Sequence, residues 1–250
     1  MRIAIDAGHF PNTPGKRCPD DSMREYHFNS TTARYAIDML LKNYEDIEIL
    51  ETFEDSRDVP LPERTDRANK WGADLFVSIH ANAAGNGWSA AEGIETFVYT
   101  SWPAPAVALA NSVQRHLIRM TGRQDRGVKA SNFHVLRETK MTSILVECGF
   151  MTNRQEAELL KSDGYRRKCA TAIVAGIAET YGPKRKPVAP EPQLPTIQKR
   201  IGVIVDGKEV GGGYLIEGTS YAPVRIVAEQ VGASVGWDGE VVHIRRRSGP

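Results

Sequence analysis

The sequence has few cysteines, almost no net charge and no long hydrophobic run. Its three cysteines among 250 residues, Cys18, Cys148 and Cys169, form no CxxC pair, which argues against a disulfide framework. A formal net charge of +1 provides no basic field for nucleic acid. No apolar stretch approaches the roughly 20 residues that span a bilayer, so membrane insertion is not expected. The remaining composition, 41% hydrophobic and 25% charged, is that of an ordinary globular protein.

The N-terminus also lacks the features of a secretory signal. Arg2 is followed by only a few apolar residues before Asp6, which is too short for the hydrophobic segment of a signal peptide. We therefore expect a chain that has no signal peptide and is made in the cytoplasm of its host.

Residues 1–182 alternate short apolar runs with longer helical patterns, which predicts one α/β domain. Its expected fold is a mostly parallel twisted sheet flanked by helices. Strands are expected at Arg2–Asp6, Ile47–Thr52, Leu75–His80, Ile94–Tyr99 and Ser143–Glu147. Helices are expected at Met23–Lys42, Leu61–Trp71, Pro105–Thr121, Arg154–Leu160 and Tyr165–Tyr181, with Thr152 as the cap of the fourth.

The pattern breaks at residues 183–196, whose five prolines indicate a stiff, extended linker. Residues 197–250 then predict a small α+β module with the order strand–strand–helix–strand–strand. Asp-Gly turns within VIVDGKEV and GWDGEVVHI support the two strand pairs.

Three of the expected strands in the first domain lead into an ionisable side chain. His9 follows IAIDAG, His80 follows DLFVSI, and Glu147 follows ILV. Polar groups at the carboxyl ends of parallel strands face the crevice where open α/β sheets bind ligands. A carboxylate there is costly to desolvate unless it meets a cation or takes part in chemistry. We therefore expect these three side chains to converge on one site.

Two imidazoles suit a zinc ion, which in a catalytic site takes three protein ligands. Glu25 and His27, at the start of the first long helix, are the alternatives for the third ligand. Residues two apart on a helix point about 200° apart, so both cannot face the metal. Glu25 is the preferred ligand, because two histidines and one glutamate form a common set in zinc hydrolases.

The motifs IAIDAGH, the Glu of MREYHFN, RTDRANKWGADLFVSIHANA, GIETFVY and ILVECGFMTN occur in this order. Together they resemble the zinc-dependent N-acetylmuramoyl-L-alanine amidases of the Amidase_3 type, over roughly residues 1–181. The resemblance implies that His9, Glu25 and His80 bind one Zn²⁺ ion and that Glu147 is the catalytic carboxylate. It also implies the reaction: zinc-activated water cleaves the amide between N-acetylmuramic acid and L-alanine of the peptidoglycan stem peptide.

Three other side chains are candidates for supporting roles. Arg137 and Lys129 are candidate cations for stabilising the transition state, and His134 is a candidate neighbour of the site. A solvated surface charge is the alternative for both cations.

The C-terminal segments VDGKEV, SYAPVRIVAEQVGASVGWD and VVHI resemble a copper amine oxidase N-terminal-like (stalk) module, with no copper implied. From Lys184 onwards, ten Lys and Arg oppose seven Asp and Glu, an excess that favours binding to anionic wall polymers. We expect a monomeric phage endolysin that acts on the cell wall after release. The alternatives are a bacterial mother-cell or autolytic amidase, a non-catalytic wall-binding protein, and a different zinc amidohydrolase such as a peptidase or a sugar deacetylase.

Overall fold

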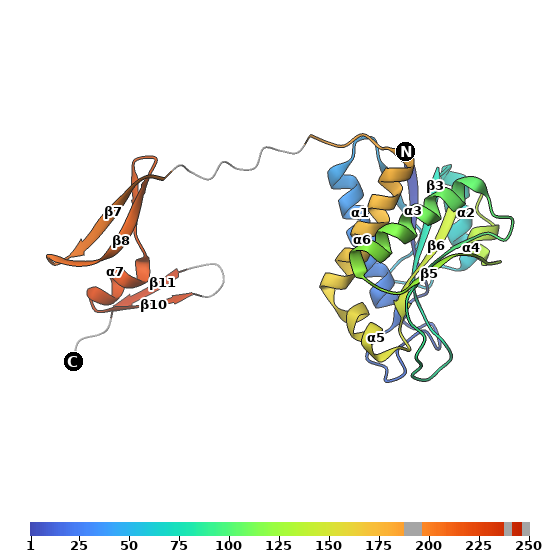
Figure 1. Ribbon diagram of the computed structural model, residues 1–250, viewed down its shortest axis with the longest axis horizontal. Helices are drawn as coiled ribbons and strands as arrows, with labels where there is room; N and C mark the ends of the chain where they lie inside the picture. The colour runs from blue at the N-terminus through green and yellow to red at the C-terminus, as the bar shows by residue number, and fades with distance from the viewer. Residues whose placement is uncertain (188–196, 238–241, 247–250) are drawn as a thin grey trace. The chain divides into compact units, whose positions relative to one another are not determined.

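The computed structural model describes residues 1–187, 197–237 and 242–246 (Figure 1). The chain divides into two compact units, Met1–Pro187 and Val188–Pro250. The first unit extends past residue 182, because the backbones of Lys184 and Lys186 hydrogen-bond to those of Glu45 and Asn43. Residues 188–196 of the predicted linker and the second Asp-Gly turn lie outside the described residues. No described helix is long and apolar enough to cross a membrane.

The first unit is built on a six-stranded sheet with the order β2-β1-β3-β6-β4-β5. The strands are β1 (Arg2–Ala7), β2 (Glu48–Glu51), β3 (Leu75–Asn82), β4 (Ile94–Val98), β5 (Asp125–Ala130) and β6 (Thr142–Phe150). Every neighbouring pair is parallel except β4 with β6, so the predicted mostly parallel sheet is confirmed. β5 was not predicted, because this half-buried edge strand has the polar sequence DRGVKA.

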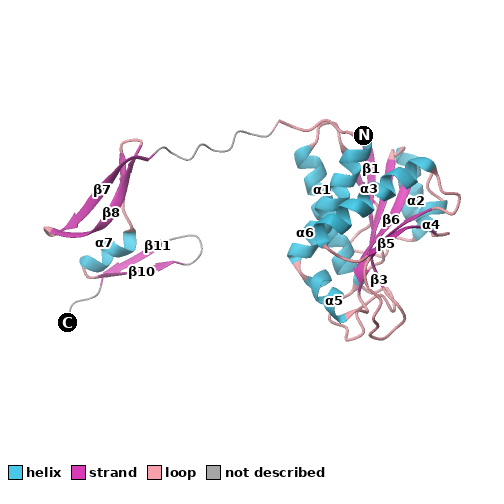
Figure 2. Ribbon diagram, in the orientation of Figure 1, coloured by secondary structure: helices cyan, strands magenta, loops and turns pink. Residues whose placement is uncertain are grey.

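Helices cover both faces of this sheet (Figures 1 and 2). On one face lie α1 (Glu25–Asn43), α3 (Ala104–Thr121) and α6 (Asp163–Tyr181). On the other face lie α2 (Leu61–Trp71) and the short α4 (His134–Arg137), which was not predicted. The predicted cap of α5 (Arg154–Lys161) is wrong by one residue. Asn153, not Thr152, caps this helix, since its side chain accepts hydrogen bonds from the backbone of Gln155 and Glu156.

Side chains alternate along the central strands, so each face of the sheet has its own core. The α1–α3–α6 layer covers Ile3, Ile5, Val77, Ile144 and Val146, whereas the α2–α4 layer covers Ala4, Phe76 and Leu145. By the same alternation Asp6, Ser78, His80 and Glu147 lie on the α2–α4 face. Cys18, Cys148 and Cys169 are all buried free cysteines.

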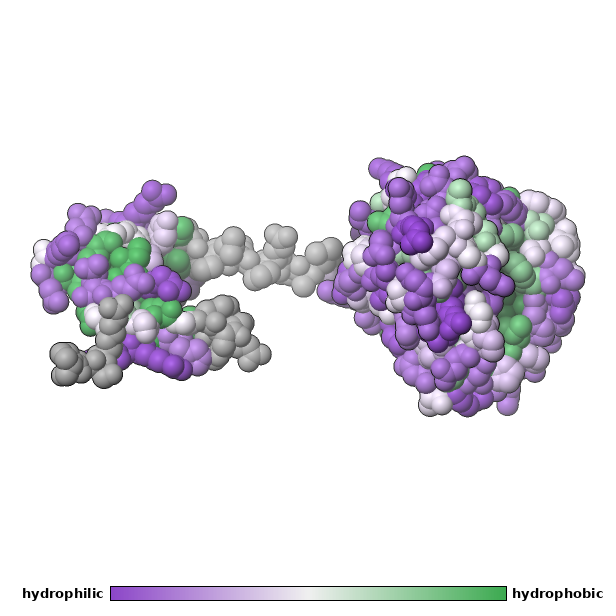
Figure 3. All heavy atoms as spheres, turned by 90° about the horizontal axis from the view of Figure 1, so that it is seen from below, coloured by the Kyte–Doolittle hydropathy of each residue, from purple (hydrophilic) through white to green (hydrophobic). Residues whose placement is uncertain are grey.

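The second unit contains two small antiparallel sheets and one helix. β7 (Ile197–Val205), β8 (Lys208–Ile216) and β9 (Thr219–Tyr221) form one sheet, and β10 (Ala233–Trp237) pairs with β11 (Val242–Arg246). Helix α7 (Val224–Gln230) lies between β9 and β10 in the chain. The predicted order of strands and helix is present, with β9 in addition. Ile204, Val231 and Ile244 are exposed, and apolar residues reach the surface of this unit in Figure 3.

Helix α6 packs against helix α3 at a glycine, which generates the first prediction. A Cβ on Gly176 would lie 2.7 Å from the Cα of Val113, and backbone cannot yield as a flexible side chain does. We expect Gly176→Ala to lower the free energy of unfolding by about 1–3 kcal/mol in urea titrations. Gly164 in the same helix has no atom within 4 Å of such a Cβ, so Gly164→Ala is the matched control and should not destabilise. Equal losses in both variants would contradict this account.

Candidate metal centre

The structure brings together His9, Glu25 and His80. One potential ligand atom from each lies within 4.8 Å of the others. His9 Nε2 is 3.2 Å from Glu25 Oε2, and His80 Nδ1 is 3.0 Å from Glu25 Oε1. The two imidazole rings are nearly perpendicular, with centroids 5.1 Å apart. The carboxylate therefore lies between the two rings, with one oxygen directed at each.

Three different elements deliver these side chains. His80 lies near the end of β3, and His9 lies in the turn after β1 with a positive φ of 65°, which is uncommon for a residue with a side chain. Glu25 is the first residue of α1, and its backbone N–H donates to the carbonyl of Lys16 at 2.9 Å. His27, the alternative to Glu25, is exposed on the same helix, as the helical angle requires.

A glycine makes room for this arrangement. A Cβ on Gly8 would lie 1.9 Å from Cε1 of the His80 ring. Asn29, one helical turn after Glu25, donates to the Gly8 carbonyl at 2.9 Å and to Glu25 Oε1 at 3.3 Å. The backbone at Gly8 is therefore hydrogen-bonded to the helix that carries Glu25 and packed closely against the ring of His80.

This donor set fits a tetrahedral zinc ion. Nitrogen and oxygen ligands about 2.0–2.2 Å from such an ion are separated from one another by roughly 3.4 Å. The separations of 3.0 and 3.2 Å between Glu25 and the two imidazoles are close to that value. Two imidazoles and one carboxylate also leave a fourth position free for a water or a substrate oxygen.

Glu147 lies beside this cluster without joining it. It is the direct neighbour of His80 in the parallel pairing of β3 with β6. Its Oε2 is shielded from solvent and has no hydrogen-bond partner within the described residues. A shielded carboxylate oxygen without a partner is costly, so an unpaired carboxylate at this position is suited to exchanging a proton with a reacting group.

The pKa values of the two glutamates are shifted in opposite directions. Burial alone would raise the pKa of Glu25, but the hydrogen bond and charge of His80 hold it below its usual range. Burial raises the pKa of Glu147 to about 8, and His80 only partly opposes this. Burial lowers the pKa of His9 to about 4, which favours the neutral imidazole that a metal requires.

A groove of about 520 Å³ opens onto this cluster. Its lining includes His9, His80, Glu147, Lys16, His134 and Leu61. His134 therefore borders the groove, as expected of a neighbour of the site. Lys16 is half-buried there, and no ion pair of Lys16 is found within the described ranges.

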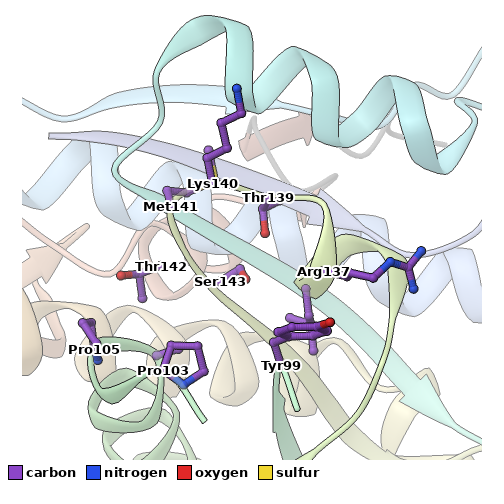
Figure 4. A pocket seen from close by; sticks show the side chains of 11 residues that line it. Tyr99, Pro103, Pro105, Arg137, Thr139, Lys140, Met141, Thr142 and Ser143 are labelled. Carbon is purple, nitrogen blue, oxygen red and sulfur yellow. The ribbon is translucent and has the colours of Figure 1, made fainter. Parts of the chain in front are cut away.

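The two cations proposed from the sequence are not available in this groove. Lys129 donates to the buried carboxylate of Glu95 at 2.5 Å. Arg137 donates to Glu138 and Asn132 and borders a separate cavity of about 290 Å³ near the other end of β6 (Figure 4). In that view the charged ends of Arg137 and Lys140 point away from Pro103 and Pro105.

Sequence reasoning did not assign any role to Asp6, Ser78 or Arg64. Arg64 is 2% exposed, and its guanidinium donates to Asp6 Oδ1 at 2.9 Å. Ser78 donates to Asp6 Oδ2 at 2.6 Å and lies 3.1 Å from His80 Nε2. One signal was present: Asp6 is a charged residue inside an apolar strand, which requires a buried partner.

Imidazoles and carboxylates that gather near the carboxyl ends of the strands of an α/β sheet are typical of metal-dependent hydrolases. Residues 3–179 match the family model for N-acetylmuramoyl-L-alanine amidase, Amidase_3. The chain belongs to this family, a group of metal-dependent amidases that act on peptidoglycan.

Individual relatives agree with the family match. The chain is 34% identical over 181 residues to N-acetylmuramoyl-L-alanine amidase CwlM of Bacillus licheniformis, covering 72% of this chain and 69% of that protein. It is 31% identical over 190 residues to the endolysin of Bacillus phage SPP1, covering 74% and 67%. The catalytic domain of the amidase CwlV from Bacillus (Paenibacillus) polymyxa var. colistinus superposes with a TM-score of 0.68 at 33% identity. This superposition covers 74% of this chain and 99% of that domain.

The close approach of Gly8 to His80 generates the second prediction. We expect Gly8→Ala to displace the His80 ring and weaken zinc binding about tenfold or more, measured by competition with a chelating dye. Gly87→Ala is the control, because a Cβ there meets no atom within 4 Å. Unchanged zinc affinity in Gly8→Ala would show that the ring is not held at this position.

Proposed function

We propose that the chain is a zinc-dependent N-acetylmuramoyl-L-alanine amidase in which His9, Glu25 and His80 hold the ion. The observation that carries the proposal is the cluster of two imidazoles and one carboxylate beside an unpaired Glu147. When bound, a zinc ion lowers the pKa of water towards neutrality and polarises a carbonyl group. A pure wall-binding protein has no need for a shielded carboxylate beside such a cluster.

In this proposal Glu147 moves the proton. In its ionised form, which a bound cation would favour, Glu147 accepts a proton at Oε2 from the attacking water and later delivers one to the amine of the departing L-alanine. Glu25, between the two imidazoles, would hold the ion as an ionised carboxylate. The groove of about 520 Å³ is large enough for the lactyl group and the first stem-peptide residues.

We also propose that the protein is made in the host cytoplasm and reaches the wall after release, as a phage endolysin. Its 31% identity to the SPP1 endolysin supports this role. A bacterial wall amidase is the second candidate, favoured by the 34% identity to the Bacillus licheniformis enzyme. Both roles use the same reaction.

For the second unit we propose binding to the cell wall as a stalk-like module. Exposed Arg200, Arg245 and Arg246 contribute to its positive excess. Because such attraction is screened by salt, the fraction of the full chain that sediments with purified walls should fall between low and high ionic strength. Salt-independent sedimentation would contradict a charge-driven contact.

The amidase proposal predicts the products of a peptidoglycan digest. Purified walls treated with the zinc-loaded chain should release new amino groups with alanine at the new N-terminus. They should release no new reducing sugar ends and no acetate, and a chelator should abolish the reaction. Walls bound without release would favour the non-catalytic alternative, and acetate release would favour a deacetylase.

Two variants of the same digest separate the roles of the residues. Glu147→Gln should retain zinc and lose turnover by at least about 100-fold, because the proton acceptor is absent. His80→Ala should lose both zinc and turnover, because it removes a ligand. A Glu147→Gln protein with full activity would overturn the role given to Glu147.

A further inference from the structure

A buried network of polar side chains borders the groove, and the amidase proposal gives it no role. The network runs from Arg64 on α2 through Asp6 on β1 to Ser78 on β3 and ends at His80. Asp6 and Ser78 are direct neighbours in the parallel pairing of β1 with β3. Arg64, Asp6 and Ser78 are 2% exposed or less, so water does not take part as it would at the surface.

We propose that Arg64, Asp6 and Ser78 are positioning residues that fix both histidines and select Nδ1 of His80 as the metal-binding nitrogen. The proposal rests on the zinc site proposed above. It specifies which atom of His80 binds the ion and which residues determine this.

The direction of the hydrogen bonds leads to that assignment. Arg64 carries a permanent charge and ion-pairs with Asp6, so the Asp6 carboxylate is ionised and only accepts hydrogen bonds. The hydroxyl of Ser78, 2.6 Å from Asp6 Oδ2, must therefore donate its single proton to Asp6. The same hydroxyl oxygen is then left to accept from His80 Nε2, 3.1 Å away.

A neutral imidazole has one N–H and one lone pair. If Nε2 carries the proton, the lone pair is on Nδ1, which lies 3.0 Å from Glu25 Oε1 inside the cluster. Metal-binding histidines commonly donate their other N–H to a carboxylate or carbonyl, which fixes the ring. Here a serine hydroxyl stands between the imidazole and the carboxylate.

The other half of the Arg64 guanidinium acts on His9. Its Nη2 donates to the His9 carbonyl at 2.8 Å, and Nη1 donates to the Ala7 carbonyl at 2.5 Å. These bonds hold both sides of the turn in which His9 has its positive φ. Nε of Arg64 donates to the Val59 carbonyl at 2.8 Å, so the guanidinium is fixed on all sides. A single buried cation thereby supports both proposed metal-binding histidines, His9 in the turn after β1 and His80 on β3.

The test compares two buried serines of the same sheet. Ser78→Ala removes the link between Asp6 and His80, whereas Ser143→Ala removes a hydroxyl that has no hydrogen bond within the described residues. We expect Ser78→Ala of the full chain to bind zinc about 10–100-fold more weakly than wild type. Ser143→Ala should bind zinc like wild type, and both variants should keep the wild-type circular dichroism spectrum.

A spectroscopic measurement tests the assignment of the nitrogen. In the full chain labelled with ¹⁵N-histidine and loaded with ¹¹³Cd²⁺, we expect cadmium–nitrogen coupling at Nδ1 of His80 and a proton on Nε2. Coupling at Nε2 would overturn the assignment, as would equal zinc affinity of Ser78→Ala and Ser143→Ala. A wild-type chain that binds neither ion would instead refute the proposed zinc site itself.

Discussion

The buried ion pair between Arg64 and Asp6 is the interaction on which the geometry of the site depends. An ion pair removed from water is tolerated only if hydrogen bonds satisfy its remaining donors and acceptors. Here backbone carbonyls of Val59, Ala7 and His9 take the other guanidinium protons, and Ser78 and Thr52 donate to the carboxylate. Removal of one partner from such a pair costs about 3–5 kcal/mol. The network therefore couples the packing of α2 on the sheet to the position of both imidazoles.

The environment gives two glutamates different chemistry on neighbouring elements. Glu25 is almost fully buried, yet it lies between two imidazoles and accepts a hydrogen bond from Asn29, which favours the ionised form. Glu147 is flanked by Glu25 and Glu95 as well as by His80, and its Oε2 has no donor within the described residues. Burial therefore raises the pKa of Glu147, whereas the pKa of Glu25 is lowered. In the proposed reaction one glutamate is thus a fixed ligand and the other is a proton carrier.

The sequence was most informative where one residue carries its own signal. His9, His80 and Glu147 each follow an apolar run that ends at one edge of a parallel sheet, and helical geometry separates Glu25 from His27. The residues that were missed act through partners distant in the chain. Arg64 and Asp6 are 58 positions apart in the chain, and Ser78 and Asp6 are 72 apart. Hydrophobic periodicity relates only residues within one helix or strand, so it cannot indicate such contacts. β5 was missed for a related reason, because an edge strand with one half-buried face needs no apolar run.

Lys129 shows why a positive charge in the sequence does not by itself identify a side chain that lines the groove. It pairs with Glu95 instead. Glu95 lies directly opposite Glu147 in the antiparallel pairing of β4 with β6, and its charge raises the pKa of Glu147. Lys129 and Arg126 neutralise Glu95 from β5, and Asn82 donates to its other oxygen. Both cations thus form ion pairs with a buried carboxylate on the strand next to Glu147. Lys16, by contrast, lines the groove, forms no ion pair within the described residues, and accepts a hydrogen bond from the backbone of Glu25 through its carbonyl.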